Sequence, residues 1–323
     1  MKKHKICKIL LVILAIFLCV AFYELLGICV AYKKQPEVSN TTKKETKNGS
    51  WNECSENTER AVIIEKNPEA LLQRVRLIKN AKKEIILSTF AFQSDESGKL
   101  ILGALHDAAD RGVHIRLLVD GMESWIDMEG NPYFYGLSSH ENVEIKLYNK
   151  ANPLKPWKMM GRMHDKYLIA DGKRYILGGR NTYNYFLGDF PGHKNYDRDV
   201  LVVCDEPEKE NSVNQLLEYF ETIWEQEDSG YFHDNKKLAN RKSVKNAVLE
   251  LQNSYQKYFE ENKERICDTD YTDETFETEK IALVSNPIHT GSKEPVVWYQ
   301  LGELMKNAKN RVKIHTPYII CND

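Results

Sequence analysis

The sequence lacks a surplus of basic residues. Its 323 residues carry 45 Lys and Arg against 47 Asp and Glu, so the formal net charge is −2. A protein that is held on nucleic acid by its overall field needs a clear positive excess, so this composition argues against that class and leaves a lipid-directed protein open. With 42% hydrophobic and 28% charged residues, the chain is of globular composition and long enough for one large domain or two smaller ones.

The seven cysteines lack the spacing of a disulfide scaffold or of a metal site. Three of them lie in the apolar N-terminal stretch: Cys7, Cys19 and Cys29. Cys204 ends an apolar strand and is expected to be a buried thiol. Cys54 and Cys267 flank the main domain, and a pairing between them stays open if the domain is exported. No cluster of metal ligands is visible, so we predict a site without metal or cofactor.

One long apolar run stands at the N-terminus. Residues 1–8 contain four Lys and no acid, residues 9–23 are uninterrupted apolar residues, and after Glu24 the run resumes through residue 32. Because a bilayer core needs roughly 20 apolar residues of helix, the run predicts an uncleaved signal anchor. A cleaved signal peptide, cut at Cys29-Val30-Ala31, is the alternative. Either interpretation places the rest of the chain outside the cytoplasmic membrane.

The rest of the chain predicts an α/β fold. The apolar stretches 85–92 and 113–119, separated by a helical pattern over 98–111, indicate a parallel βαβ unit. Asp171-Gly172 between the short apolar runs 167–170 and 175–177 is typical of a hairpin. Further strands are expected over 143–147, 200–203 and 281–284, and further helices after Asn67 as N-cap and over 208–224 and 236–265.

A repeat suggests how these elements are organised. Residues 77–82 return as residues 304–309, and the following stretches, 85–92 and 312–319, share Thr89 and Thr316 at the same offset of 227. Chance similarity of helix ends is the alternative to a duplicated α/β unit. The predicted domains are a transmembrane anchor (1–34), a disordered linker (35–60), a first domain (61–230), a helical connector (231–275) and the start of a second domain (276–323).

The residues with the most specific chemistry lie between 163 and 200. His164 and Lys166 are two apart on an expected strand, so both project from one face. Asp171 occupies the turn, and Gly178-Gly179-Arg180-Asn181 follows. A neutral imidazole can attack phosphorus and form a covalent intermediate, and a carboxylate on its other nitrogen fixes the tautomer. A lysine supplies positive charge to the phosphoryl oxygens on which charge builds up.

This pattern, His-x-Lys-x4-Asp followed by Gly-Gly-x-Asn, resembles the motif of the phospholipase D superfamily. The stretch 61–224 is most similar to bacterial cardiolipin synthase-type members. The resemblance implies a sandwich of two α/β halves, each a mixed or parallel sheet flanked by helices, of which this sequence holds one complete half and the start of a second. It also implies that each half gives one motif to a shared site. The implied catalytic residues are His164, Lys166, Asp171, Asn181 and Asp199.

The resemblance implies a role for each of these residues. His164 attacks phosphorus, Lys166 stabilises the developing charge, and Asp171 orients the lysine from the turn. Asp199 is preferred to Asp197 as the carboxylate that orients the histidine, and Asn181 is either a site residue or the cap of a following helix. The aromatic residues that bracket the motif are expected in the core, with a lipid-facing rim as the alternative: Trp157, Tyr183, Tyr185 and Phe186.

The function implied is a metal-independent phosphatidyl transferase or phospholipase that acts on phosphatidylglycerol-type lipids through a phosphohistidine. An endonuclease of the same superfamily and a non-catalytic, membrane-tethered lipid-binding protein are the alternatives; nucleic acid is not the expected partner. The sequence contains no second His-x-Lys motif. A second half or a second copy of the chain would therefore have to complete the site, and we expect the isolated chain to be inactive and prone to aggregate.

Overall fold

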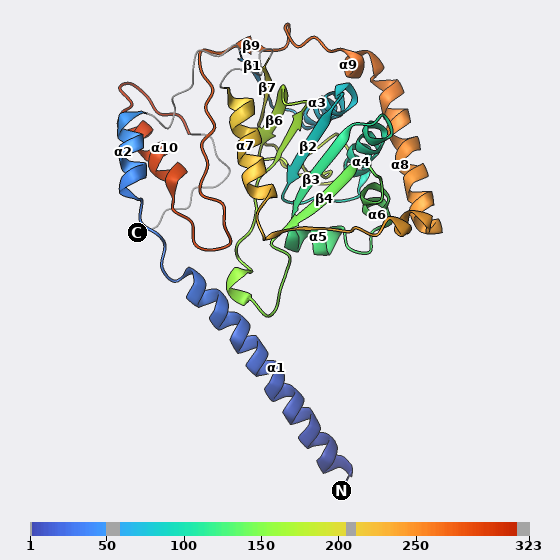
Figure 1. The fold of residues 1–323 in the computed structure, drawn as a ribbon, viewed down its shortest axis with the longest axis vertical. Coiled ribbons are helices and arrows are strands. Elements are labelled where there is room, and N and C mark those ends of the chain that lie inside the picture. Colours follow the sequence, from blue (N-terminus) through green and yellow to red (C-terminus); the bar gives the residue numbers. More distant parts are fainter. Residues whose placement is uncertain (1, 50–58, 205–210, 315–323) are drawn as a thin grey trace.

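A single mixed sheet organises the molecule. The computed structural model describes residues 2–49, 59–204 and 211–314, and in this part of the chain nine strands pair in the order β8-β4-β3-β2-β5-β6-β7-β1-β9 (Figure 1). The strands are β1 (Glu59–Ile64), β2 (Glu84–Thr89), β3 (His114–Asp120), β4 (Val143–Tyr148), β5 (Tyr167–Ala170), β6 (Arg174–Gly178), β7 (Asp199–Cys204), β8 (Ser229–Tyr231) and β9 (Phe276–Glu277). The pairs β2–β3 and β3–β4 are parallel and the other pairs are antiparallel.

Helices cover both faces of the sheet. The described helices are α1 (Lys2–Tyr32), α2 (Asn40–Asn48), α3 (Asn67–Asn80), α4 (Glu96–Asp110), α5 (Gly121–Asp127), α6 (Pro132–Ser138), α7 (Ser212–Trp224), α8 (Lys242–Glu261), α9 (Lys263–Cys267) and α10 (Val296–Lys306), with short 3-10 turns at η2 (Pro156–Lys158) and η3 (Lys236–Asn240). One face packs against α3, α4, α6 and, outside them, α8. The other face packs against α7. The predicted α/β class, with a mixed sheet flanked by helices, is confirmed.

The alternation of strand β5 shows how the two faces are built. Leu168 and Ala170 belong to the core under α3 and α4, whereas Tyr167 and Ile169 belong to the core under α7. All four side chains are buried, because the strand lies in the middle of the sheet. The predicted βαβ unit (β2, α4, β3) and the predicted hairpin (β5, β6) are both present.

The topology brings several chain segments to one end of the sheet. β2, β3 and β4 all end there, at Thr89, Asp120 and Tyr148. β5 runs antiparallel to β2, so Tyr167 at its beginning pairs with Ser88 near the end of β2. We call this the lower end of the sheet, since it points downwards in Figure 1, where α5 continues from it. Residues that immediately precede β5 therefore lie beside those that follow β2 and β3.

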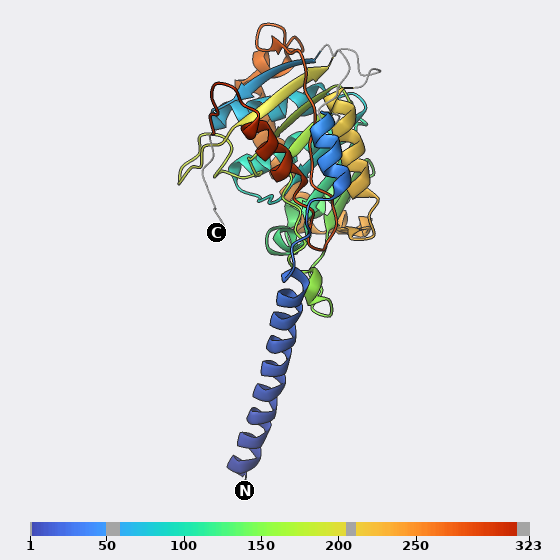
Figure 2. The same ribbon diagram turned by 90° about the vertical axis from the view of Figure 1, so that its left-hand side faces the viewer.

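Helix α1 leaves the molecule at this lower end (Figures 1 and 2). Its segment Lys5–Tyr32 is long and apolar enough to cross a membrane and has a mean hydropathy of 2.9 in its most apolar window, none of which is buried against the rest of the protein. The Tyr32 hydroxyl donates to the Thr290 carbonyl (2.8 Å), and the Tyr23 hydroxyl donates to the Leu154 carbonyl (3.0 Å). The last turns of the helix are thus attached to the domain.

The structure departs from the sequence-based expectations in three helical segments. Part of the expected disordered linker is helical, since α2 is capped by the Ser39 hydroxyl, which accepts from the Thr42 amide (3.1 Å). Helix α3 begins as expected, but its N-cap is Lys66 rather than Asn67 and forms no side-chain cap bond. The helix expected over 236–265 is divided into η3, α8 and α9.

The expected strands after residue 280 are not observed in the described chain. Residues 281–284 are extended but pair with no strand, and residues 312–314 are not in a strand either. Residues 315–320 lie outside the described residues, as do Cys54 and Cys321. Cys204 is buried, as predicted, and Cys267 is exposed. Strand β9, which pairs with β1, comes from the segment that was assigned to the second domain.

Candidate active site

His164 and Lys166 lie side by side at the lower end of the sheet. Strand β5 begins only at Tyr167, so both residues stand in the extended segment before it rather than within the strand. The register is nevertheless kept, because the Gly178 amide donates to the Lys166 carbonyl (3.1 Å). Lys166 Nζ donates to the His164 carbonyl (2.6 Å). The lysine side chain is buried, and the imidazole is exposed.

The aromatic ring of Phe90, which directly follows β2, lies among the ionisable groups of this segment. The Phe90 ring meets the His164 imidazole edge to face, with the ring centroids 4.6 Å apart. Lys166 Nζ and the Arg162 guanidinium lie 5.3 and 4.9 Å from the centroid of the same ring. Cations near an aromatic face are stabilised without being neutralised, so the ring leaves the charge of Lys166 available to another partner.

Asp120, at the end of β3, fixes the segment that precedes the histidine. Its buried carboxylate accepts from the Met163 amide (3.1 Å) and pairs with the Arg162 guanidinium (2.7 Å). The same carboxylate caps α5 by accepting from the Met122 amide (3.0 Å). Sequence reasoning missed this residue, although its position at the carboxyl end of a predicted parallel strand is where functional side chains gather in α/β sheets.

The surroundings shift both motif residues toward their less charged forms. Burial lowers the pKa of His164, and the neighbouring Lys166 lowers it further, while Asp120 partly opposes this effect. Burial likewise lowers the pKa of Lys166 to about 8, against the attraction of Asp165, Asp197 and Asp120. At neutral pH the imidazole is therefore largely unprotonated, as a nucleophile must be, and the lysine is still largely a cation.

The structure pairs Asp199 with two arginines rather than with His164, so its orienting role stays a prediction that no contact in the described chain supports. Its carboxylate is fully buried and pairs with Arg74 (2.9 Å) and Arg180 (3.2 Å) under the α3 side of the sheet. A Cβ added at Gly178 would lie 2.0 Å from Asp199 Oδ1, so the glycine makes room for this carboxylate. The Arg74–Asp199–Arg180 group holds strand β7 against α3.

Asp197 is nearer to the motif residues than Asp199. It contributes to the field at Lys166, and a Cβ added at Gly179 would lie 2.0 Å from Asp197 Oδ2. The two glycines therefore admit one carboxylate each, a structural one and one that faces the site. The glycine pair was expected to let the backbone approach a ligand; in the structure it lets two acids approach the backbone.

Asp171 lies at the opposite, upper end of the sheet and does not contact Lys166. It sits at the β5–β6 turn with a φ of 55°, and its carboxylate accepts from the amides of Lys82, Lys83 and Glu84 at 2.7–3.1 Å. These amides precede β2, so Asp171 joins the turn to the start of that strand. The structure does not support the predicted lysine-orienting role.

Asn181 connects the lower ends of β6 and β2. Its side chain is buried, and Oδ1 accepts from the Ala91 amide (3.2 Å). No helix follows it within residues 182–204, all of which the structure describes, so the alternative role as a helix cap is wrong. Of the five predicted site residues, the structure places His164, Lys166 and Asn181 at the lower end of the sheet and gives Asp171 and Asp199 contacts that belong to folding.

A cleft of about 400 Å³ opens over the motif on the α7 side. His164, Lys166 and Arg162 line one wall, and Leu283, Ile288 and Lys293 line another. Asp165 lies between them: the Tyr219 hydroxyl donates to its carboxylate (2.7 Å), and burial raises the pKa of Asp165 while Lys293 opposes this. The segment 281–297 was expected to open a new domain; in the structure it forms a wall of this cleft.

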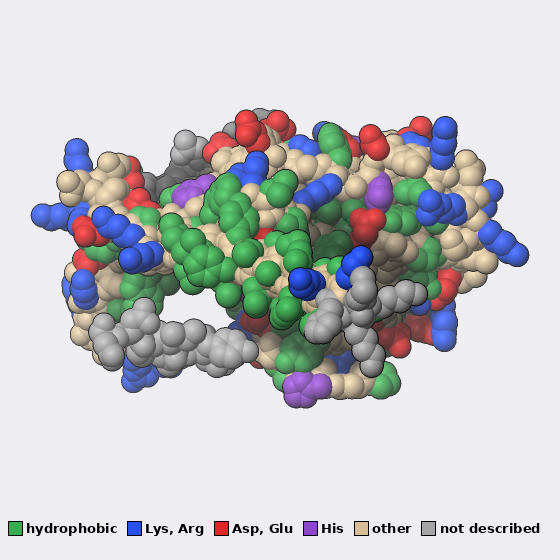
Figure 3. All heavy atoms as spheres, turned by 90° about the horizontal axis from the view of Figure 1, so that it is seen from below, with side chains coloured by type: hydrophobic (Ala, Val, Ile, Leu, Met, Phe, Trp, Pro, Cys, Tyr) green, Lys and Arg blue, Asp and Glu red, His purple; other side chains and the backbone are tan. Residues whose placement is uncertain are grey.

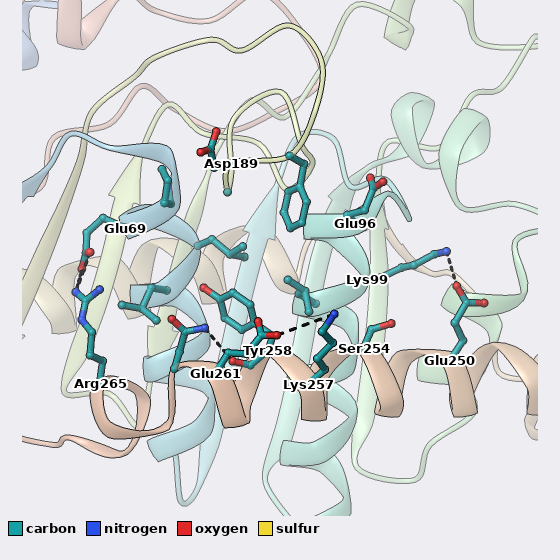
Figure 4. A pocket seen from close by; sticks show the side chains of 17 residues that line it. Glu69, Glu96, Lys99, Asp189, Glu250, Ser254, Lys257, Tyr258, Glu261 and Arg265 are labelled. Carbon is teal, nitrogen blue, oxygen red and sulfur yellow. Dashed lines mark hydrogen bonds and ion pairs between the residues drawn. The ribbon is translucent and has the colours of Figure 1, made fainter.

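A larger cavity, of about 590 Å³, lies on the opposite face between α3, α4 and α8 (Figure 4). Most of its charged residues pair with one another, as in Lys99–Glu250 (2.6 Å) and Arg265–Glu69 (2.8 Å). Groups that neutralise each other hold helices together and are poor candidates for catalysis. The smaller cleft is the candidate site, since it holds the shifted histidine and lysine.

Known proteins resemble this chain in the region that carries the cleft. Residues 74–224 match the family described as "Cardiolipin synthase, PLD-like domain". An uncharacterized protein of Helicobacter pylori is 30% identical over 212 residues, which are 61% of this chain and 39% of the relative. Cardiolipin synthase C of Escherichia coli is 29% identical over 171 residues, 49% of this chain and 34% of the relative. The chain thus spans about two fifths or less of the length of these relatives.

Solved structures that resemble the fold are more distant. NucT from Helicobacter pylori has a TM-score of 0.42 at 16% identity and is covered to 99%, over 54% of this chain. The phosphatidylserine synthase of Haemophilus influenzae has a TM-score of 0.44 at 17% identity, covering 76% of this chain and 52% of that protein.

Proposed function

We propose that this chain, which belongs to the phospholipase D superfamily, cleaves and transfers phosphodiesters of membrane phospholipids, with His164 as nucleophile. The observation that carries the proposal is the pairing of an exposed imidazole of lowered pKa with a buried lysine at the mouth of one cleft. A neutral imidazole supplies the lone pair, and the lysine supplies the positive charge that a phosphoryl transition state requires.

The proposed reaction proceeds in two displacements. An imidazole nitrogen of His164 attacks phosphorus, a P–N bond forms, the P–O bond to the leaving alcohol breaks, and that alcohol takes up one proton. An acceptor alcohol or water then gives up a proton and attacks the phosphohistidine, which releases the imidazole. The proton donor and acceptor is a second His-x-Lys motif, supplied by a second half or a second copy of the chain. Lys166 stabilises the phosphoryl oxygens in both steps.

Phospholipid is the proposed substrate rather than nucleic acid. The sequence has no basic excess, the N-terminal helix is apolar enough to cross a membrane, and two matched relatives are cardiolipin synthases. We further propose that α1 is retained as an anchor and that the domain lies outside the cytoplasmic membrane. A cleaved signal is the alternative, and the mass of the N-terminal peptide of the mature protein distinguishes the two.

The test offers both substrates to a form of the protein that carries two His-x-Lys motifs. Vesicles of phosphatidylglycerol and a plasmid are incubated with wild type and with His164→Ala. We expect release of glycerol or formation of diphosphatidylglycerol by wild type alone, with the plasmid intact. Plasmid cleavage without lipid turnover would establish the nuclease alternative, and binding of lipid without turnover would favour a non-catalytic lipid-binding protein.

A further inference from the structure

Large apolar side chains are exposed around the base of α1. Trp125 and Ile126 on α5 are 67% and 66% exposed, and Leu154, Trp157 and Met160 in the loop 149–163 are 79%, 45% and 56% exposed. Figure 1 draws α5 and this loop below the sheet, beside the upper part of α1. An exposed apolar patch of this kind marks a surface that contacts a protein or a membrane.

The loop 149–163 packs directly on α1, so the position of the loop along the helix axis is known. A Cβ added at Gly27 would lie 2.5 Å from Pro156 Cγ, which means that helix and loop are in close contact at this glycine. One helical turn lower, the Tyr23 hydroxyl donates to the Leu154 carbonyl (3.0 Å). Residues 154–156 are therefore level with Tyr23–Gly27.

The length of α1 places that level inside the membrane boundary. Residues 9–32, which are apolar except for Glu24, rise about 36 Å at 1.5 Å per residue, whereas a bilayer core is about 30 Å thick. The exposed Lys33 and Lys34 follow directly and fit the headgroup layer. Counted from residue 9, a core about 30 Å thick ends about 20 residues further along the helix, near residue 29. Gly27 then lies about 3 Å and Tyr23 about 9 Å inside that boundary. The apolar side chains of the loop thus stand where headgroups meet acyl chains.

The charges around the patch fit an anionic membrane. Lys150 and Lys155 are exposed beside the apolar loop residues, and Lys33 and Lys34 are exposed directly after the end of α1. Figure 3, which views the molecule from this end, shows apolar side chains gathered in the middle of the face, with Lys, Arg and some Asp and Glu at several points around them. Basic residues beside an apolar surface attract anionic headgroups.

We propose that α5 and the loop 149–163 form a second membrane contact beside α1, in which Trp125, Leu154 and Trp157 enter the headgroup–acyl boundary of an anionic bilayer. The loop continues into Arg162 and His164, and α5 follows Asp120. The contact therefore holds the lower end of the sheet, and with it the cleft, at the lipid surface. The inference rests on the proposed function in one respect, the retention of α1.

Tryptophan fluorescence tests the contact on the full chain. The protein is reconstituted into phosphatidylcholine–phosphatidylglycerol vesicles that carry bromine either near the carbonyl end or near the methyl end of the acyl chains. We expect quenching to be stronger with the shallow bromine, because the two tryptophans lie at the boundary. The double variant Trp125→Phe/Trp157→Phe should lose at least about half of that quenching, since interfacial tryptophans contribute most of it.

Trp298 supplies the matched control, because it is 70% exposed on α10, which lies beside the sheet rather than at its lower end. Trp298→Phe should leave the quenched fraction unchanged. Equal quenching in wild type and in the double variant would overturn the inference. The measurement needs no turnover, because it reports only the membrane contact. Quenching of these tryptophans together with no lipid turnover by the form that carries two His-x-Lys motifs would refute the proposed function alone, and turnover by that form without quenching would refute the membrane contact alone.

Discussion

Two groups of charged residues lie at the lower end of the sheet, and they are built in opposite ways. In the Arg74–Asp199–Arg180 group, one carboxylate pairs with two guanidinium groups, and all three side chains are buried. In the His164–Lys166 pair, the lysine donates to a backbone carbonyl and forms no ion pair among the residues that the structure describes, and the imidazole is exposed to the cleft. The charges of the first group pair with one another, whereas the charge of the second group is available to a ligand.

This comparison distinguishes structural residues from reactive ones, which the sequence motif alone cannot do. Both groups contain residues of the His-x-Lys and Gly-Gly-x-Asn region or of the strand that follows it. Paired buried charges contribute to the fold, because removing one partner leaves the other desolvated. A histidine and a lysine whose pKa values are lowered by burial, in an open cleft, are typical of a reactive site. Substitutions in the two groups should therefore affect different measurements.

His164→Ala should give the largest effect, a loss of lipid turnover of ~10⁴-fold or more, as expected when a covalent nucleophile is removed. The melting temperature should change by less than ~2 °C, because the imidazole is exposed and meets the Phe90 ring edge to face at the rim of the cleft. Turnover of phosphatidylglycerol and thermal unfolding are measured on the same preparation. His114→Ala, at the upper end of the sheet and also partly exposed, is the control and should retain turnover.

Asp199→Ala should show the reverse pattern. Two buried guanidinium groups would lose their shared carboxylate, which lowers the free energy of unfolding by about 3–5 kcal/mol. Asp197→Ala, two residues away and partly exposed, should lower it by less than ~1 kcal/mol. Denaturant unfolding curves of the two variants check this difference. If Asp199→Ala unfolds like wild type but loses turnover, the two groups were assigned the wrong way round.

Lys166→Ala should lower turnover by ~10²-fold, through lost stabilisation of the phosphoryl oxygens. The pH dependence sharpens this prediction. Lys166 acts as a cation and has a pKa of about 8, so turnover should fall as the pH rises through about 8. Lys166→Arg keeps a positive charge at every accessible pH, so its lower turnover should not fall over that range. An alkaline limb that is identical in wild type and Lys166→Arg would assign the titration to another group.

Much of the fold was predictable because the apolar patterns and the turns agree. The stretches that became β2 and β3 are mostly apolar, and Asp171-Gly172 stands between two short apolar runs, so strand, helix and hairpin followed from local sequence. The segment 281–284 has the same apolar character but no strand beside it to pair with, and Leu283 packs against the core under α7 instead. The local sequence pattern cannot show whether an apolar segment becomes a strand, because strand pairing depends on the rest of the sheet.

The chemical type of the site was predictable from the sequence, but the contacts of its individual residues were less so. His164 and Lys166 were found because their spacing is fixed by the motif. The sequence could not show that Asp199 rather than Asp197 is buried, because both acids lie at the start of the same apolar strand and the arginines that bury Asp199 come from α3 and from the glycine-pair segment. Asp120 was missed because its partners, Arg162 and the Met163 amide, are 42 and 43 residues away in sequence. Such contacts follow from topology, which brings the end of β3 to the motif.

Asp171→Asn should have the smallest effect on turnover. It distinguishes a structural role of Asp171 in the turn from a role in orienting Lys166. The structure gives its carboxylate three backbone amides at the start of β2, so the substitution should lower the free energy of unfolding by about 1–2 kcal/mol. Asparagine tolerates the positive φ of this position, so the turn itself should persist. Turnover per folded molecule should stay within ~2-fold of wild type, because the residue lies at the far end of β5 from Lys166 and hydrogen bonds beyond the site contribute little to the barrier. Asp189→Asn, in an exposed position, is the matched control and should change neither quantity. A loss of turnover near that of Lys166→Ala, at unchanged stability, would instead support the lysine-orienting role that the motif suggested.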